Sequence, residues 1–385
     1  MRKIILPKQL LIFLLISLLP IGGCFDRRDI ERRTTVLAVA IDSNVEEPAG
    51  FEITVQLANA YNIGGSVGGG EGGGGGGDSK AVEVITTRGK NLATMFNKIE
   101  TIVDNPLAFG HSLFLIISKE IATEGIYDYL DYFLRNPQFR RKAWLLIAPK
   151  KAKDILTLTP SLHPVPPLYV IRVLDSLADM NMIPTTRIED FMVALNCPAE
   201  QPVAVIIEPA GQNIKLGGLA AFQDNRVVGD LNPAETILFL YLKQDNTEGI
   251  VQLENPETKA TEIIYEIFNT SSSAKPHFDD GQLSFTIDLW VEGNVVEKRI
   301  STPLNDDSFI QHLERRLATK LTNDIQKLIS KIQKELQTDI LHLGEIIRAH
   351  YPHYWDQVDW QELFPQIPIK IQVTANIRRT GMRLE

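Results

Sequence analysis

IQHLERRLATKLTNDIQKLISKIQKEL, residues 310–336, carries the strongest periodic signal in the chain. Its apolar residues recur every three or four positions, at Ile310, Leu313, Leu317, Leu321, Ile325, Leu328, Ile332 and Leu336. This spacing gathers them on one face of a single long amphipathic helix. The apolar face must be covered either by a sheet of the same chain or by a helix of a partner. We expect the sheet.

Strand-like runs flank this helix in the sequence. Those at 262–268 and 282–291 precede it, and a final run at 367–377 follows it. Together they predict an antiparallel sheet that the last strand re-enters. Further upstream, 216–222 and 227–229 predict a hairpin around a polar turn, after which a helix begins with Pro233 at its first position.

The first half of the chain alternates short strands with helices. The expected strands lie at 35–41, 51–57, 81–86, 113–117 and 143–147, with helical periods at 92–103 and 120–134. This alternation predicts an α+β or α/β layer with helices packed on a sheet, and for the whole chain we expect an α+β fold with mixed and antiparallel sheets packed with helices. Prolines punctuate residues 160–210, so we divide the mature chain into an N-terminal domain, 24–200, and a C-terminal domain, 201–385. Its length also allows three domains.

The N-terminus has the features of a bacterial lipoprotein signal. A basic segment and a short apolar run lead to Ile21-Gly22-Gly23-Cys24, and the run is far shorter than the ~20 residues that cross a bilayer. We expect residues 1–23 to be a signal peptide that is cleaved between Gly23 and Cys24. Cys24 would then carry a diacylglyceryl thioether and an N-acyl chain of the palmitate type, which together anchor the mature protein stably to a membrane.

The charge and the cysteine count restrict the class of protein. The chain has a formal net charge of -9, and loss of the three basic side chains of residues 1–23 makes the mature protein -12. An acidic protein of this kind is not expected to bind nucleic acid. Once Cys24 is acylated, Cys197 is the only thiol, so no disulfide is expected despite the exported location.

Residues 64–77 contain eleven glycines in fourteen positions. Such a tract behaves as flexible coil and cannot bury a core, so we expect a flexible loop. A phosphate-binding loop would close with Lys-Ser or Lys-Thr and enter a helix, whereas this tract leads into a strand. A nucleotide cofactor is therefore not expected.

The histidines provide the few candidates for chemistry. His342, His350 and His353 form the only local group, but Pro352 interrupts it and no cysteine is close in sequence. A metal site usually needs three or four converging ligands, so we expect surface or capping histidines and no metal. His111 could act as a general base, but no nucleophile or carboxylate is fixed beside it in sequence. We predict no catalytic residues and no cofactor.

Several motifs resemble the Ger(x)C family of spore germination lipoproteins, and they occur in the same order from Cys24 to near the end of the chain. Phe25, Asp29 and His342-Leu343 depart from the family's usual residues. The matching segments are Cys24 to Ile30, Phe109-Gly110-His111, Arg135-Asn136-Pro137, Gly218 to Phe222, Val228 to Leu231 with Glu235, Gln337 to Ile340, Gly344, Trp355, Trp360, Phe364 and Ile377 to Gly381.

The resemblance implies a non-catalytic subunit of a spore nutrient germinant receptor. Such a lipoprotein accompanies A- and B-type integral-membrane subunits, and it would be lipid-anchored on the outer face of the inner spore membrane. Because Trp is enriched at interfaces, Trp355, Trp360 and Phe364 are our candidates for an exposed patch that contacts these partners. Packing under the last strand is the alternative for each of them.

Two further function classes remain open from the sequence, a tethered solute-binding protein and, after it, a membrane-tethered hydrolase. Exported solute-binding lipoproteins share the same signal and size, so a tethered solute-binding protein is the alternative to a receptor subunit. That alternative needs two α/β lobes around a cleft, and the long helix with antiparallel strands fits it poorly.

Overall fold

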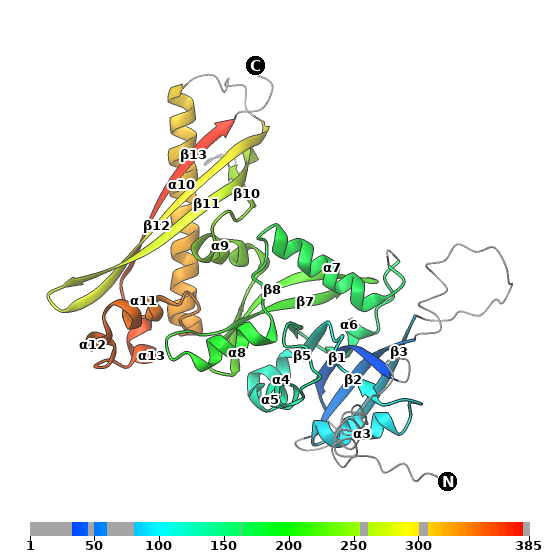
Figure 1. Ribbon diagram of the computed structural model, residues 1–385. Helices are drawn as coiled ribbons and strands as arrows, with labels where there is room; N and C mark the ends of the chain where they lie inside the picture. Colours follow the sequence, from blue (N-terminus) through cyan, green and yellow to red (C-terminus); the bar gives the residue numbers. More distant parts are fainter. Residues whose placement is uncertain are drawn as a thin grey trace, which may run out of the picture.

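The computed structural model describes residues 33–44, 50–59, 81–161, 163–254, 261–299 and 307–379. Two sheets, one of nine strands and one of four, organise this part of the chain (Figure 1). Helices pack on both sheets, so the predicted α+β fold class is confirmed.

The nine-stranded sheet contains most of the first half of the chain. Its order is β3-β2-β1-β5-β6-β7-β8-β9, with β4 paired to β1. Strands β1 to β3 form an antiparallel meander, whereas β5 and β6 run parallel to β1. The strands are β1 (Thr34–Ser43), β2 (Phe51–Ala58), β3 (Val82–Gly89), β4 (Leu107–Ala108), β5 (Phe114–Ser118), β6 (Trp144–Ala148), β7 (Val203–Ala210), β8 (Asn213–Gln223) and β9 (Arg226–Leu231).

Helices cover both faces of the central strands. All five residues of β5 and all five of β6 are buried, as expected for parallel strands with helices on each side. Leu115 and Leu145 face one core, and Ile116 and Leu146 face the other. The helices on the first side are α3 (Leu92–Glu100), α4 (Lys119–Glu124), α5 (Tyr127–Arg135) and α8 (Ile188–Asn196); those on the second are α6 (Lys153–Leu156) and α7 (Pro166–Asp179).

The four-stranded sheet is built around one long hairpin. Its order is β10 (Gly249–Glu254), β11 (Thr261–Asp279), β12 (Gln282–Lys298) and β13 (Ile369–Arg379). Side chains of β12 alternate strictly between buried and less buried positions over most of its length, which places one face on a core. At the tip, Asp280 and Gly281 both have positive φ, as a two-residue hairpin turn requires. Both strands are longer than we predicted.

Helix α10 (Asp307–Lys331) lies along this sheet (Figure 1). Leu313, Leu317 and Ile325 of its predicted stripe are fully buried and share a core with β12 and β13. The sheet of the same chain therefore covers the helix, as we expected. A π-helical turn, η3 (Ile332–Leu336), extends α10, and Gln337 ends it in the left-handed conformation with φ 51°.

Short helices connect the two sheets. Helix α9 (Pro233–Lys243) follows β9, and it begins with a capping box between Asn232 and Glu235. After η3 come α11 (Leu343–His350), α12 (Pro352–Trp355), α13 (Trp360–Leu363) and the 3-10 turn η4 (Phe364–Gln366). One continuous core contains residues of both sheets and of these connecting helices.

The predicted boundary at residue 200 lies inside this arrangement. Strands β7 to β9 follow the boundary in sequence but belong to the nine-stranded sheet, because β7 pairs with β6 through Val205 and Ile206. The division into 24–200 and 201–385 remains a prediction about folding units.

Candidate functional site

The predicted lipidation site lies outside the described residues. The same is true of the signal peptide, 1–23, with its cleavage site at Gly23 and Cys24, and of the glycine tract, 64–77. Membrane attachment through Cys24 and a flexible loop at 64–77 therefore remain predictions. Within the described ranges, none of the helices combines the length and the apolar composition needed to cross a bilayer.

A buried carboxylate, Asp339, organises the junction between the sheets. We use "junction" for the packed region formed by the end of β8, the η3 turn and helices α11 and α13. Oδ2 of Asp339 accepts hydrogen bonds from the backbone N–H of Gly344 at 2.7 Å and from Nε1–H of Trp360 at 3.0 Å. Burial raises the pKa of Asp339, although these donors and the nearby Lys243 favour the charged carboxylate.

Glycine at position 344 is required by the close packing of this junction. A Cβ atom there would lie 2.7 Å from Nε1 of Trp360 and 3.1 Å from the carbonyl oxygen of Ala199. Gly229 is similarly constrained, since its Cβ would lie 2.4 Å from Cδ2 of Leu336. Both glycines belong to the motifs that carried the family resemblance, and both permit two segments to approach closely.

The resembling segments of the chain meet at this junction although they are far apart in sequence. The hydroxyl of Thr338 donates to the carbonyl oxygen of Phe222 at 2.8 Å. Nζ of Lys331 lies 2.7 Å from Oε2 of Glu235, which also caps α9. These contacts give the motif residues a structural role in joining the end of α10 and the segment after η3 to helix α9 and strand β8.

The aromatic residues proposed as an exposed patch lie mostly inside this junction. Trp360 is 7% exposed and Phe364 is 1% exposed. The expectation of an exposed patch is therefore wrong for these two, because Asp339 and the core under β13 already cover them. Trp355 is half-buried, with its ring centroid 5.6 Å from that of Trp360, and its contact with a partner stays a prediction.

His342 lies at the surface of the junction, where α11 begins. Its Nε2 lies 3.1 Å from the carbonyl oxygen of Gln201, so this nitrogen carries the proton and donates. Burial, reinforced by the positive charge of Lys243, lowers the pKa of His342 to about 4. His111, His350 and His353, by contrast, are exposed.

The fold also brings Cys197 next to Glu345 at the start of α11. The sequence alone did not predict this proximity. Sγ of Cys197 lies 3.8 Å from Oε2 of Glu345, and Nδ1 of His342 lies 3.8 Å from Oε2 of Glu200. The only signal in the sequence is a repeated spacing, Cys197-x-x-Glu200 and His342-x-x-Glu345. That spacing is too common to indicate a site until the two turns are seen together.

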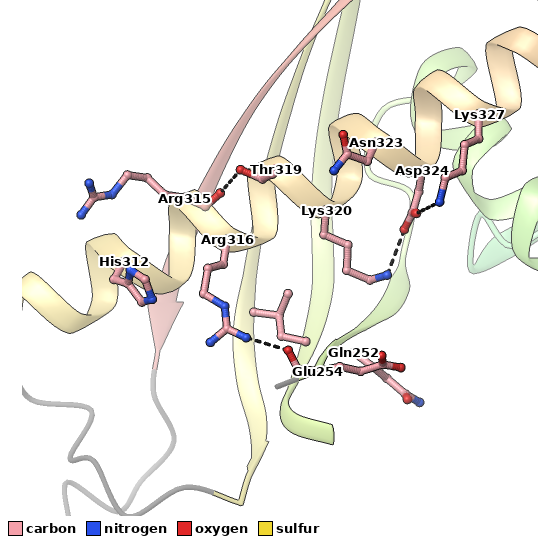
Figure 2. Close-up of a pocket in the computed structure, with 11 residues that line it drawn as sticks. Gln252, Glu254, His312, Arg315, Arg316, Thr319, Lys320, Asn323, Asp324 and Lys327 are labelled. Atoms are coloured by element: carbon pink, nitrogen blue, oxygen red, sulfur yellow. Dashed lines mark hydrogen bonds and ion pairs between the residues drawn. The ribbon is translucent and has the colours of Figure 1, made fainter. Parts of the chain in front are cut away.

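A basic groove runs between α10 and the edge strand β10 (Figure 2). It encloses about 550 Å³. Nη2 of Arg316 donates to the carbonyl oxygen of Glu254 at 2.9 Å, and Figure 2 shows this side chain reaching from the helix toward the strand. Lys320 and Lys327 share Asp324, at 3.0 and 3.8 Å. The Lys and Arg side chains that line the groove outnumber its acidic ones, in a chain of net charge -9.

Comparison with protein families assigns both parts of the chain. Residues 26–209 match the model described as "Spore germination protein N-terminal domain". Residues 217–381 match the model described as "Spore germination B3/GerAC like, C-terminal".

Relatives and one solved structure agree with these matches. The chain is 28% identical to the putative spore germination protein YfkR of Bacillus subtilis, over 99% of this chain and 97% of the relative. It is 25% identical to spore germination protein KC of the same organism, over 97% and 96%.

The crystal structure of the GerBC protein has the same fold. It superimposes with a TM-score of 0.58 at 20% identity, covering 88% of this chain and 96% of the other. With the two family models matched in order along the sequence, these findings show that the chain belongs to the Ger(x)C family of spore germination proteins.

Proposed function

We propose that this chain is the lipid-anchored, non-catalytic subunit of a spore nutrient germinant receptor and that it assembles with A- and B-type integral-membrane subunits. The observation that carries the proposal is the ordered match of both germination-protein models along nearly the whole chain. The relatives are named as spore germination proteins, which supports a role in germination.

The protein would act by binding and positioning its partners. The buried polar groups of the junction support this role because they are used for packing: Asp339 holds Gly344 and Trp360, and Thr338 holds Phe222. Oδ2 of Asp339 and the hydroxyl of Thr338 therefore serve as packing contacts.

The groove along α10 is the surface that we propose for partner contact. It is open, and its basic side chains complement an acidic segment on a membrane subunit. Charge complementarity of this kind steers association and selects the partner. Among the described strands β10 pairs only with β11, so its other edge, which borders the same groove, offers backbone hydrogen-bonding groups to an extended segment, apart from the Glu254 carbonyl that Arg316 binds.

Purification from spore membranes tests the assembly. The lipidated chain would be tagged, solubilised in mild detergent and recovered, and the proteins that come with it identified by mass spectrometry. We expect integral-membrane receptor subunits. A folded, membrane-bound chain that brings none of them would contradict the proposal, and stabilisation of that chain by an amino acid, sugar or nucleoside would favour the solute-binding alternative.

The anchor is tested separately with Cys24→Ala. In cells lacking the partner subunits, we expect the substituted protein to be folded and to leave the membrane fraction, since each buried methylene of the lost acyl chains contributes ~0.8 kcal/mol to anchoring. Cys197→Ala is the matched control and should remain in the membrane. Equal membrane fractions for the two variants would show that Cys24 is not the anchor.

A further inference from the structure

Four side chains with metal-binding atoms meet where α8 ends and α11 begins. Sγ of Cys197 and one carboxylate oxygen each of Glu200 and Glu345 all lie within 4.8 Å of one another. Nδ1 of His342 lies 3.8 Å from Oε2 of Glu200. We propose that Cys197, Glu200, His342 and Glu345 bind one Zn²⁺ ion.

The spacing of these atoms suits a tetrahedral ion. Zinc bonds of about 2.0–2.3 Å place neighbouring ligand atoms roughly 3.3–3.8 Å apart. The Sγ–Oε2 distance between Cys197 and Glu345 is 3.8 Å. Two tight turns hold the pairs, since the N–H of Glu200 donates to the carbonyl oxygen of Cys197 and that of Glu345 to the carbonyl oxygen of His342, both at 3.2 Å. Cys197, Glu200 and Glu345 already lie within 4.8 Å of one another, and His342 approaches this group through Glu200, so side-chain rotation must bring its ring to the ion.

The orientation of His342 points to a cation. Nε2–H is used by the carbonyl oxygen of Gln201, so in the neutral ring Nδ1 presents a lone pair toward the carboxylate of Glu200. Two acceptors then face one another with no proton between them. A carbonyl on the second nitrogen is the usual way in which a metal-binding histidine is oriented. The backbone of His342 is also in the left-handed region, with φ 59°, a conformation that costs energy and directs the ring.

The charges and ligand types favour zinc. A thiolate with an imidazole selects zinc over magnesium or calcium, which prefer oxygen ligands alone. On binding, the Cys197 thiol releases its proton to solvent and its sulfur donates the electron pair. Nε and Nη2 of Arg348 contact Glu345, both at 2.7 Å, and they leave its other lone pairs for the ion. Arg348 and the nearby Lys243 offset the negative charge of a thiolate and two carboxylates.

Cobalt substitution tests the site directly. The full-length chain carrying Cys24→Ala, in which Cys197 is the only cysteine, would be purified in detergent, stripped with chelator and titrated with Co²⁺. We expect one equivalent to give tetrahedral d–d absorption with a thiolate charge-transfer band, and Zn²⁺ to displace it. Cys197→Ser should remove that band, and His342→Gln should weaken binding by about 10–100-fold or more.

His350→Gln is the matched control, because His350 lies exposed in the last turn of the same helix. It should bind cobalt like the parent chain. Absence of a tetrahedral spectrum from the parent, or a spectrum that Cys197→Ser leaves unchanged, would overturn the proposal.

A second measurement needs no substitution in the site and so does not depend on whether a variant folds. The rate at which iodoacetamide alkylates Cys197 would be compared with Zn²⁺ present and with chelator present. Because only a free thiolate attacks the reagent, bound zinc should slow alkylation by at least about tenfold. Equal rates would overturn the site, whatever the outcome for the receptor role.

Discussion

The groove lies along α10 and the junction around Asp339 begins where the η3 extension of that helix ends, yet the two regions use polar side chains in opposite ways. In the junction, Asp339 is 3% exposed and each donor that it binds comes from the packed interior. In the groove, Asp324 pairs with Lys327, whose side chain is 81% exposed. Removal of a buried partner leaves other groups unsatisfied, whereas water replaces a lost surface partner. The free energy of unfolding should therefore depend mainly on the junction. Association with the membrane subunits should depend mainly on the groove.

Asp339→Ala should give the largest effect. It leaves the Gly344 N–H and the Trp360 indole N–H unpaired inside the junction, so we expect a loss of about 3–5 kcal/mol in the free energy of unfolding. Denaturant unfolding measures it. Asp324→Ala in the groove is the control and should cost under about 1 kcal/mol. Equal losses for the two variants would show that the junction and the groove contribute alike to stability.

Lowering the pH should destabilise the protein through His342, at the edge of the junction. Its pKa is about 4 in the folded chain and about 6.5 unfolded. Between these values the unfolded chain binds the extra proton, so the free energy of unfolding falls as the pH is lowered, by up to about 3 kcal/mol.

The measurement is the difference between the parent and His342→Gln, with chelator present so that no metal ion contributes. The difference is needed because Asp339, whose pKa burial raises, has the opposite pH dependence. An identical dependence in both proteins between pH 6.5 and 4 would contradict the assignment to His342.

Trp360→Phe removes only the indole N–H that donates to Asp339. We expect a loss of about 1–3 kcal/mol, since the ring volume is largely kept. Trp355→Phe, at the half-buried neighbour, should have a much smaller effect. If both variants unfold at the same denaturant concentration, the hydrogen bond to Asp339 does not stabilise the junction.

Charge reversal in the groove should have the smallest effect on stability. Lys320→Glu with Lys327→Glu should change the free energy of unfolding by less than about 1 kcal/mol. It should nevertheless reduce recovery of the membrane subunits in the purification above, because it reverses the charge that we propose they bind. Lys275→Glu on the long hairpin, also exposed and paired with an aspartate, is the control. Unchanged recovery would remove the groove as the contact surface.

The sequence determined the elements whose pattern is local. The stripe of α10 and the alternating residues of β12 follow from periodicity, because a helix or a half-buried strand repeats its environment every few residues. The short apolar runs of β5 and β6 are typical of strands buried on both faces. The family resemblance could likewise be stated from short motifs in order.

Other features depend on contacts between segments that are distant in sequence. The distal half of β11, which includes Ser271, Ser272, Ser273 and Pro276, has few of the β-branched and aromatic residues that favour strands, and its strand conformation depends on pairing with β12. Whether β7 joins the first sheet depends on two residue pairs with β6. The approach of Cys197 to Glu345 and of His342 to Gln201 joins segments more than a hundred positions apart, and Trp360 is buried by folding back onto Asp339. Local propensity cannot report such contacts, because their energy exists only once the chain has brought the partners together.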